Sequence, residues 1–205
     1  MAYATGNAGA AHLAWARYEQ AIYAGNYSKA ADLVSDRYLN FEGEQRKRAL
    51  LADENEMIGL PILAKWFVAN FRSQVYDGSL SADTLRNVNE ERDFHASWLA
   101  AGTERRLPHG LMFVLPLGPK HAIGWFGPKG DFSLSALVFA MALDMRVNFH
   151  KENDTWRFNV LPAMEASIAE NQYYFQGDVT GKQLLSLTLA PNDAAKQRAL
   201  WKPID

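Results

Sequence analysis

The chain of 205 residues contains no cysteine. Disulfides, thiolate nucleophiles and cysteine-ligated zinc are therefore excluded together. An excess of charge of one sign is also lacking, because 21 Lys and Arg residues oppose 23 Asp and Glu residues and leave a formal net charge of −2. Such a chain has no overall field that would attract nucleic acid or an anionic membrane surface, so we expect no nucleic-acid partner.

Long hydrophobic runs are missing as well. The longest, LVFAMAL, stops at Asp144 and is far short of a membrane span. The opening MAYATGNAGAAH has neither a basic nor a long apolar segment, so it is not itself a signal peptide. It could be a mature start from which a signal has been removed. We therefore expect an extracytoplasmic location, for instance the periplasm, with the cytoplasm as the alternative.

The residues that are present suffice for a substantial core. The chain is 48% hydrophobic and 12% aromatic, which predicts one domain over residues 1–205. Changes in residue composition and periodicity along the sequence divide this domain into four parts. They are N-terminal helices at 1–71, a helical insertion at 72–110, a strand meander at 111–162 and a helical extension at 163–205.

The first part begins with a helical hairpin. Four residues recur there at helical spacing, namely Ala11, Trp15, Tyr18 and Ile22. Gly25 and Asn26 interrupt the pattern, and Asn26 is a natural N-cap for a second helix. Further helices are predicted at 43–58, after Pro61 and over 79–101, the last with Ser81 or Asp83 as cap and Gly102 as stop.

A strand-rich block follows, and it ends in a hairpin at 147–162. Alternation places Val147, Phe149, Trp156 and Phe158 on a buried face. The other face carries polar residues, namely Asp144, Arg146, Asn148, His150, Arg157 and Asn159. We predict that Phe149 pairs with Trp156 across a turn at 151–154. The preceding run at 133–147 is ambiguous between helix and strand, and its position between turns favours a strand.

Two segments carry a family resemblance. They are W-x-x-Y-x-x-A-I-x-A-G-N-Y-x-K-A-x-x-L-V-S at 15–35 and V-N-F-x-K-E-N-D-T-W-R-F at 147–158. Together they resemble the nuclear-transport-factor-like superfamily, which shares a bent cone with ketosteroid isomerase and scytalone dehydratase. The resemblance implies an α+β fold with N-terminal helices packed on a curved antiparallel sheet, the cystatin-like cone. Enzymes of the superfamily bind small ligands in the cone, whereas other members use the same surfaces to bind partners.

Evidence for catalysis is weak in the sequence. The five histidines lack the spacing of a compact metal site. His95, with Asp93 and Glu91, could form an acid–base set, but a charged helix segment is usually solvated, so we predict that His95 faces solvent. The basic residues at 46–48 are likewise predicted to be a solvated helix face. We predict no catalytic residue, no metal and no cofactor.

Two functions remain open. We favour a non-enzymatic binding or accessory protein of the toxin-neutralising, immunity type, which acts on a protein partner or on a second copy of itself. The alternative is a small-molecule isomerase or dehydratase that uses the cone as its active site. The predicted partner-binding residues are Asp144, Arg146 and Arg157 on the sheet and Arg105 and Arg106 in a loop. Arginine suits this role because its planar fork holds carboxylates with two hydrogen bonds.

Overall fold

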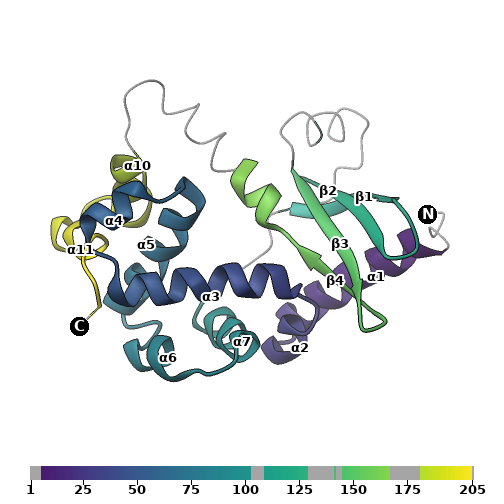
Figure 1. Ribbon diagram of the computed structural model, residues 1–205, viewed down its shortest axis with the longest axis horizontal. Helices are drawn as coiled ribbons and strands as arrows, with labels where there is room; N and C mark the ends of the chain where they lie inside the picture. Colours follow the sequence, from purple (N-terminus) through teal and green to yellow (C-terminus); the bar gives the residue numbers. More distant parts are fainter. Residues whose placement is uncertain (1–5, 103–108, 129–140, 142–144, 167–180, 205) are drawn as a thin grey trace. The chain divides into compact units, whose positions relative to one another are not determined.

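The computed structural model describes residues 6–102, 109–128, 141, 145–166 and 181–204 (Figure 1). The chain forms two compact units, each built from two separate stretches. The first unit comprises Met1–Leu39 and Thr103–Ser167, and the second comprises Asn40–Gly102 and Ile168–Asp205. Arg105, Arg106 and Asp144, and most of the ambiguous run at 133–147, lie outside the described residues.

The first unit opens with the predicted helical hairpin, α1 (Asn7–Tyr23) and α2 (Tyr27–Ala31). Gly25 has a φ of 68°, a left-handed conformation that glycine adopts without strain, and it ends the first helix. The side chain of Asn26 accepts a hydrogen bond from the Lys29 amide, which confirms the predicted cap. Trp15 and Tyr18 are buried, as their spacing predicted.

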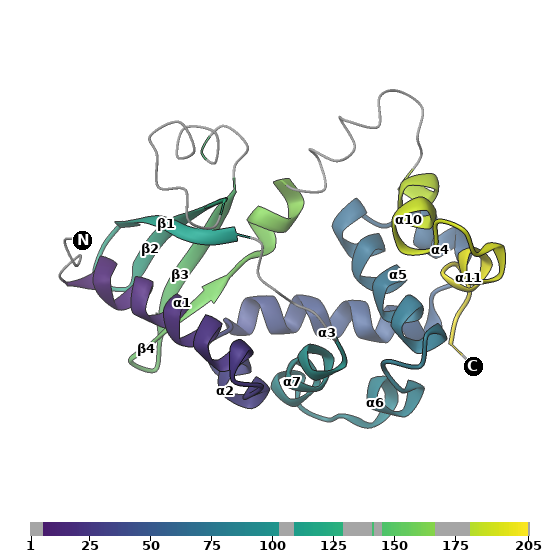
Figure 2. The ribbon, with the colours of Figure 1, turned by 180° about the vertical axis from the view of Figure 1, so that it is seen from behind.

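An antiparallel sheet of four strands completes this unit, in the order β1 (His109–Pro116), β2 (His121–Pro128), β3 (Arg146–Glu152) and β4 (Thr155–Asn159). Helix α1 contacts β1, β2 and β4, and Figure 2 shows it lying along the sheet. The Trp15 ring lies 4.6 Å from that of Phe126 and 5.0 Å from that of Phe158. The α+β class with an antiparallel sheet is therefore confirmed.

The outer edge of β4 is protected by backbone pairing. The Ser35 amide donates to the Phe158 carbonyl at 2.8 Å, and the Phe158 amide donates to the Leu33 carbonyl at 3.0 Å. The segment that leads into α3 therefore occupies the edge where another strand would otherwise add.

The hairpin of β3 and β4 confirms the predicted core but not the predicted register. Val147, Phe149 and Phe158 are at most 1% exposed, and Trp156 is also buried. Phe149 lies opposite Phe158 rather than Trp156, because the turn contains only Asn153 and Asp154. Both turn residues have positive φ, the geometry of a two-residue hairpin turn. The register error is two residues, which leaves the core side chains on their predicted face.

The second unit is helical and continues from α3 (Asp36–Leu51), which begins in the first unit. Its other helices are α4 (Glu54–Gly59), α5 (Ile62–Tyr76), α6 (Ala82–Asn87), α7 (Glu91–Ala101), α10 (Gly181–Leu189) and α11 (Ala194–Ala199). Pro61 precedes α5, the Ser81 hydroxyl caps α6 and Gly102 ends α7, as predicted. Within the described residues, no helix is long and apolar enough to cross a membrane.

Two predicted helices are divided in the structure. The helix expected at 43–58 is α3 and α4, separated at Asp53, whose side chain forms a capping box with Glu56. The helix expected at 79–101 is α6 and α7, separated at residues 88–90. There the Val88 carbonyl accepts a hydrogen bond of 2.7 Å from Arg46, an acceptor that a continuous helix would use internally.

The predicted insertion and extension belong to one packed core. Helix α5 contacts both α10 and α11, and its Phe71 ring lies 5.4 Å from Phe94 and 5.5 Å from Trp98 of α7. Residues that appeared to be additions to a cone therefore share one hydrophobic interior with part of the N-terminal helical region.

Candidate functional site: the outer face of the sheet

One face of the sheet packs on α1, and the opposite face is the outer face. Along β2 and β3 the side chains alternate between buried and more exposed positions. Within the described residues, the outer face comprises Phe113, Leu115, His121, Ile123, Trp125, Arg146, Asn148, His150, Glu152 and Arg157. Strands β1 and β2 supply its apolar residues, whereas β3 and β4 supply its polar ones except His121, which is on β2.

The apolar half of the outer face is unusually exposed. Phe113 is 46% exposed and Leu115 is 42% exposed. Phe113 and Trp125 are register partners whose rings stack with centroids 6.1 Å apart. A β-bulge between Leu111 and Phe113 sets this arrangement, since one extra residue exchanges the faces of those that follow. Without the bulge, Phe113 would point towards α1.

Arg157 organises the polar half. Its Nη1 atom lies 2.9 Å from the Glu152 carboxylate and 3.2 Å from the Asp36 carboxylate. The Arg157 side chain is only 17% exposed. The guanidinium of Arg157 therefore binds carboxylates of its own unit. These ion pairs limit the two-hydrogen-bond contact with a partner's carboxylate that the sequence predicted for this residue. Arg146 lies opposite Trp125 and joins the polar and apolar halves.

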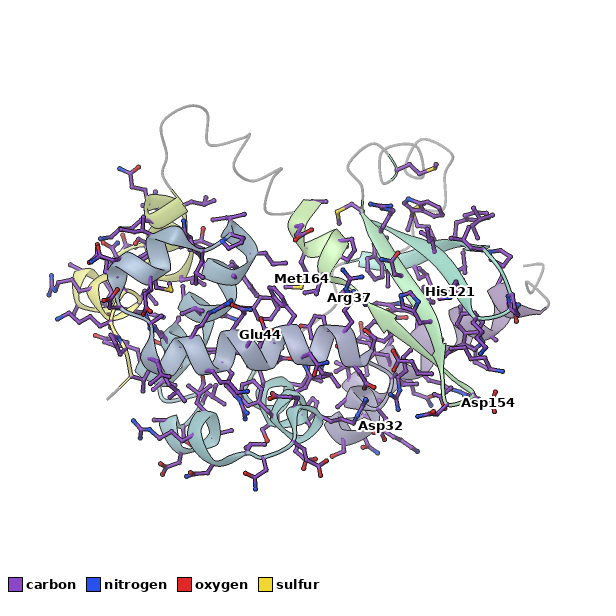
Figure 3. All side chains as sticks on the ribbon, in the orientation of Figure 1. Asp32, Arg37, Glu44, His121, Asp154 and Met164 are labelled. Atoms are coloured by element: carbon purple, nitrogen blue, oxygen red, sulfur yellow. The ribbon has the colours of Figure 1, made fainter. Side chains whose placement is uncertain are left out.

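A pair of histidines lies beside this ion-pair network. His121 of β2 and His150 of β3 are register partners, and their Nδ1 atoms are 2.9 Å apart. One ring must donate this hydrogen bond and the other must accept it, so the pair cannot keep the bond when both rings are doubly protonated. Figure 3 marks His121 on the sheet. The sequence did not predict this pair, because 29 residues separate its members.

The pH dependence of stability should report on His150. Its burial, followed by the nearby charges of His121 and Arg37, holds its pKa below the usual 6.5, while Glu152 opposes the shift. The unfolded chain then binds more protons than the folded chain as the pH falls below about 6.5. The stabilisation is complete above that pH and is lost as the pH falls through the folded-state pKa of His150.

We therefore expect wild type to lose more stability than His150→Gln when the pH is lowered from about 7.5 to about 5. The difference should be below about 1 kcal/mol, because the pair is partly exposed to solvent. Urea unfolding followed by circular dichroism measures it. His12→Gln, a substitution of an exposed histidine on α1, should follow wild type. Equal losses in wild type and His150→Gln would contradict the assignment.

A second polar cluster lies inside the helical unit. The His95 Nδ1 atom is 2.6 Å from Glu42 Oε2, and their side chains are 3% and 1% exposed. The prediction that His95 faces solvent is therefore wrong. Asp93 is exposed, as expected, whereas Glu91 pairs with Arg46 at 3.3 Å. The charge pattern of α7 could not identify Glu42, since this partner comes from α3.

Arg46 also departs from its predicted solvated position. It is 5% exposed, and its guanidinium lies 4.9 Å from the centre of the Phe94 ring. Gly43 of α3 makes room for its partner, because a Cβ atom there would collide with the Glu91 carboxylate. The four charged or polar side chains Glu42, Arg46, Glu91 and His95 thus tie α3 to α7. The burial of Glu42, Arg46 and His95 indicates a structural role.

The predicted site residues therefore have different outcomes. The structure places Arg146 and Arg157 on one face, as expected, while Asn159 is 2% exposed and bonds to the Leu161 amide instead of lining that face. Among the described residues, no group of three or more Asp, Glu or His side chains could hold a metal ion. Comparison of the chain with models of protein families, with curated proteins and with solved structures found no match.

Proposed function

We propose that the chain is a non-enzymatic binding protein whose outer sheet face holds a protein partner. One observation carries the proposal: Phe113, which is 46% exposed, stacks on the partly exposed Trp125 beside Arg146 on the same face. Protein interfaces are enriched in aromatic residues and arginine. Contiguous exposed apolar side chains with a polar rim are typical of such surfaces.

The class of partner is proposed from the same face. A toxin-neutralising, immunity-type protein binds one macromolecule and blocks it, and it requires no chemistry of its own. The fixed ion pairs of Arg157 favour that role, since an ordered polar rim gives specificity without further ordering. A second copy of the chain is the other occupant we consider. The helical hairpin followed by an antiparallel meander also supports a fold of the nuclear-transport-factor-like type.

The alternative is a small-molecule isomerase or dehydratase. The hydrogen-bonded pair of Glu42 and His95 favours it, because a carboxylate that orients a histidine is a common acid–base arrangement. However, both side chains are almost fully buried, and they belong to the helical unit rather than to the sheet. A substrate would need a rearrangement of α3 and α7 to reach them, so we rank this function second.

Site-specific crosslinking in cells tests the proposed face. A photoreactive amino acid replaces Phe113, and a matched chain carries it instead at Leu187 of α10, which is 50% exposed. We expect a discrete crosslinked protein from position 113 that is missing from position 187. A crosslink to the chain itself would identify the partner as a second copy. Equal products from both positions, or no product from position 113, would contradict the proposal.

Binding of the purified partner provides the quantitative test. Phe113→Ala and Arg146→Ala should each weaken binding by about tenfold, or about 1.4 kcal/mol. The affinity should also fall as salt rises, since charges further apart than about 8 Å are already screened at about 0.15 M. Arg198→Ala is the control, because Arg198 is exposed on α11 of the other unit. Unchanged affinity in both test variants, with circular dichroism intact, would exclude this face.

A further inference from the structure

The geometry points to a two-histidine site for a transition-metal ion, Cu²⁺ or Ni²⁺, formed by His121 and His150 on the outer face. This inference does not depend on the proposed partner. The sequence predicted no metal because its histidines lack a compact spacing, but an antiparallel sheet can bring distant residues together. These two are direct register partners, and such partners have Cβ atoms about 4.5–5.5 Å apart.

The backbone holds both histidines in place from two sides. The Lys151 amide, next to His150, donates to the Lys120 carbonyl at 2.9 Å. The Leu117 amide donates to the His121 carbonyl at 2.9 Å. Ala122 and Phe149, the chain neighbours that point towards the core, are 2% and 0% exposed. The two imidazoles therefore project from a rigid part of the sheet, and little ordering is needed to bring them together.

The type of ligand favours the metal, and the short separation of the two nitrogen atoms allows one ion to be bound by both. Two nitrogens bound at about 2.0–2.1 Å to one ion are about 2.9 Å apart at a right angle and about 3.3 Å apart at a tetrahedral angle. The Nδ1 to Nδ1 distance of 2.9 Å in the hydrogen-bonded pair is close to both values, so small ring movements suffice to bind one ion. The affinity of imidazole nitrogens for divalent ions rises through Ni²⁺ to a maximum at Cu²⁺ and falls again at Zn²⁺, so Cu²⁺ is the favoured ion and Ni²⁺ the second probe.

Metal binding replaces the hydrogen bond between the rings. The ring planes are 82° apart, so the rings must turn about their Cβ–Cγ bonds until both lone pairs point at the ion. In the neutral state the donor ring moves its proton from Nδ1 to Nε2, and no net proton is released. The ring centroids are 5.0 Å apart, whereas the two Nδ1 atoms are 2.9 Å apart, so the rings approach each other through their Nδ1 edges.

The surroundings determine which ions are rejected. The nearby carboxylate of Glu152 is already paired with Arg157 at 2.9 Å. Hard cations such as Ca²⁺ and Mg²⁺ require carboxylate oxygens, which this site does not offer in the described part of the chain. Imidazole nitrogens are neutral ligands, and they bind Cu²⁺ and Ni²⁺ without the help of a carboxylate. The remaining coordination positions stay open to water.

Metal titration of the full chain, carrying no polyhistidine tag, tests the site. Cu²⁺ is added at about pH 7.5 with glycine as a weak competitor, and Ni²⁺ is the second probe. We expect one equivalent of Cu²⁺ per chain, with an electron paramagnetic resonance spectrum that shows two coordinated nitrogens from histidine. Excess Ca²⁺ or Mg²⁺ should not displace it. Displacement by either ion would overturn the assignment of imidazole ligands.

Three matched variants complete the experiment. His121→Gln and His150→Gln should each weaken Cu²⁺ binding by about tenfold or more, because each removes one of two ligands. His12→Gln should bind as wild type does, since His12 is an exposed histidine on α1. Wild-type affinity in both test variants would overturn the site. So would a spectrum of the wild-type protein with fewer than two histidine nitrogens, which needs no variant.

This test and the crosslinking test fail independently. The titration contains no protein partner, so a negative result does not contradict the proposed partner-binding face. Conversely, a missing crosslink at position 113 does not contradict the proposed two-histidine metal site.

Discussion

Replacing Arg72 by alanine should lower the free energy of unfolding by about 3–4 kcal/mol. The side chain is 2% exposed and donates to four backbone carbonyls. Its Nε atom donates to Ala49 at 3.0 Å, Nη1 to Leu200 at 3.2 Å, and Nη2 to Arg48 at 3.2 Å and to Ala52 at 2.5 Å. These acceptors include carbonyls in the last turn of α3, where backbone donors run out, although the Arg48 carbonyl also accepts from the Ala52 amide at 2.8 Å.

The charge of Arg72 contributes along with its geometry. Burial lowers the pKa of Arg72 to about 10, so the guanidinium remains protonated at neutral pH. A cation at the C-terminal end of α3 interacts favourably with the helix dipole. Arg72→Lys should recover only part of the loss, because an ammonium group on one stem cannot reach carbonyls in several directions.

Urea unfolding measures this effect, with Arg198→Ala as the matched substitution. Arg198 is exposed on α11, and its replacement should cost less than about 0.5 kcal/mol. If Arg72→Ala and Arg198→Ala shift the urea midpoint equally, Arg72 does not hold the helical unit together.

The second large effect is expected in the sheet, where Phe158→Ala should lower the free energy of unfolding by about 3–5 kcal/mol. Phe158 is 1% exposed. Its ring lies 5.0 Å from Trp15, 4.7 Å from Tyr18 and 6.3 Å from Phe149. Alanine would leave a cavity among three aromatic rings from α1 and β3, which cannot close by small movements.

Phe113→Ala is the matched control for this prediction. It makes the same substitution in the same sheet, but at a side chain that is 46% exposed on the outer face. We expect a loss below about 1 kcal/mol. Equal losses for both variants would mean that the packing on α1 does not dominate the stability of the first unit. The control also separates folding from partner binding, because only the latter should depend on Phe113.

Local chemistry explains the correct predictions from sequence. Asn26 and Ser81 cap helices because their short polar side chains accept hydrogen bonds from first-turn amides. Period-two alternation identified the core residues of the last hairpin, because successive side chains of a strand point to opposite faces. That same alternation could not detect a register error of two residues, since such a shift leaves every face unchanged.

The polar residues were harder to place. Glu42, Arg46 and His95 lie in segments whose charge density predicts solvent, yet all three are buried. A buried charge requires a partner, and these partners come from another helix. Spacing within one helix carries no information about the residue that faces it from the next.

Sequence alone therefore determined the α+β class, the helical hairpin, several helix ends and the faces of the last two strands, because neighbouring residues set these features. Only the tertiary structure decided the rest. It joined α3 to α7 through largely buried polar pairs, gathered helices of residues 40–102 and of the C-terminal stretch into one core, and exposed Phe113 beside Trp125. It also paired His121 with His150. These features depend on contacts between distant segments, which packing and strand register select and local propensity does not encode.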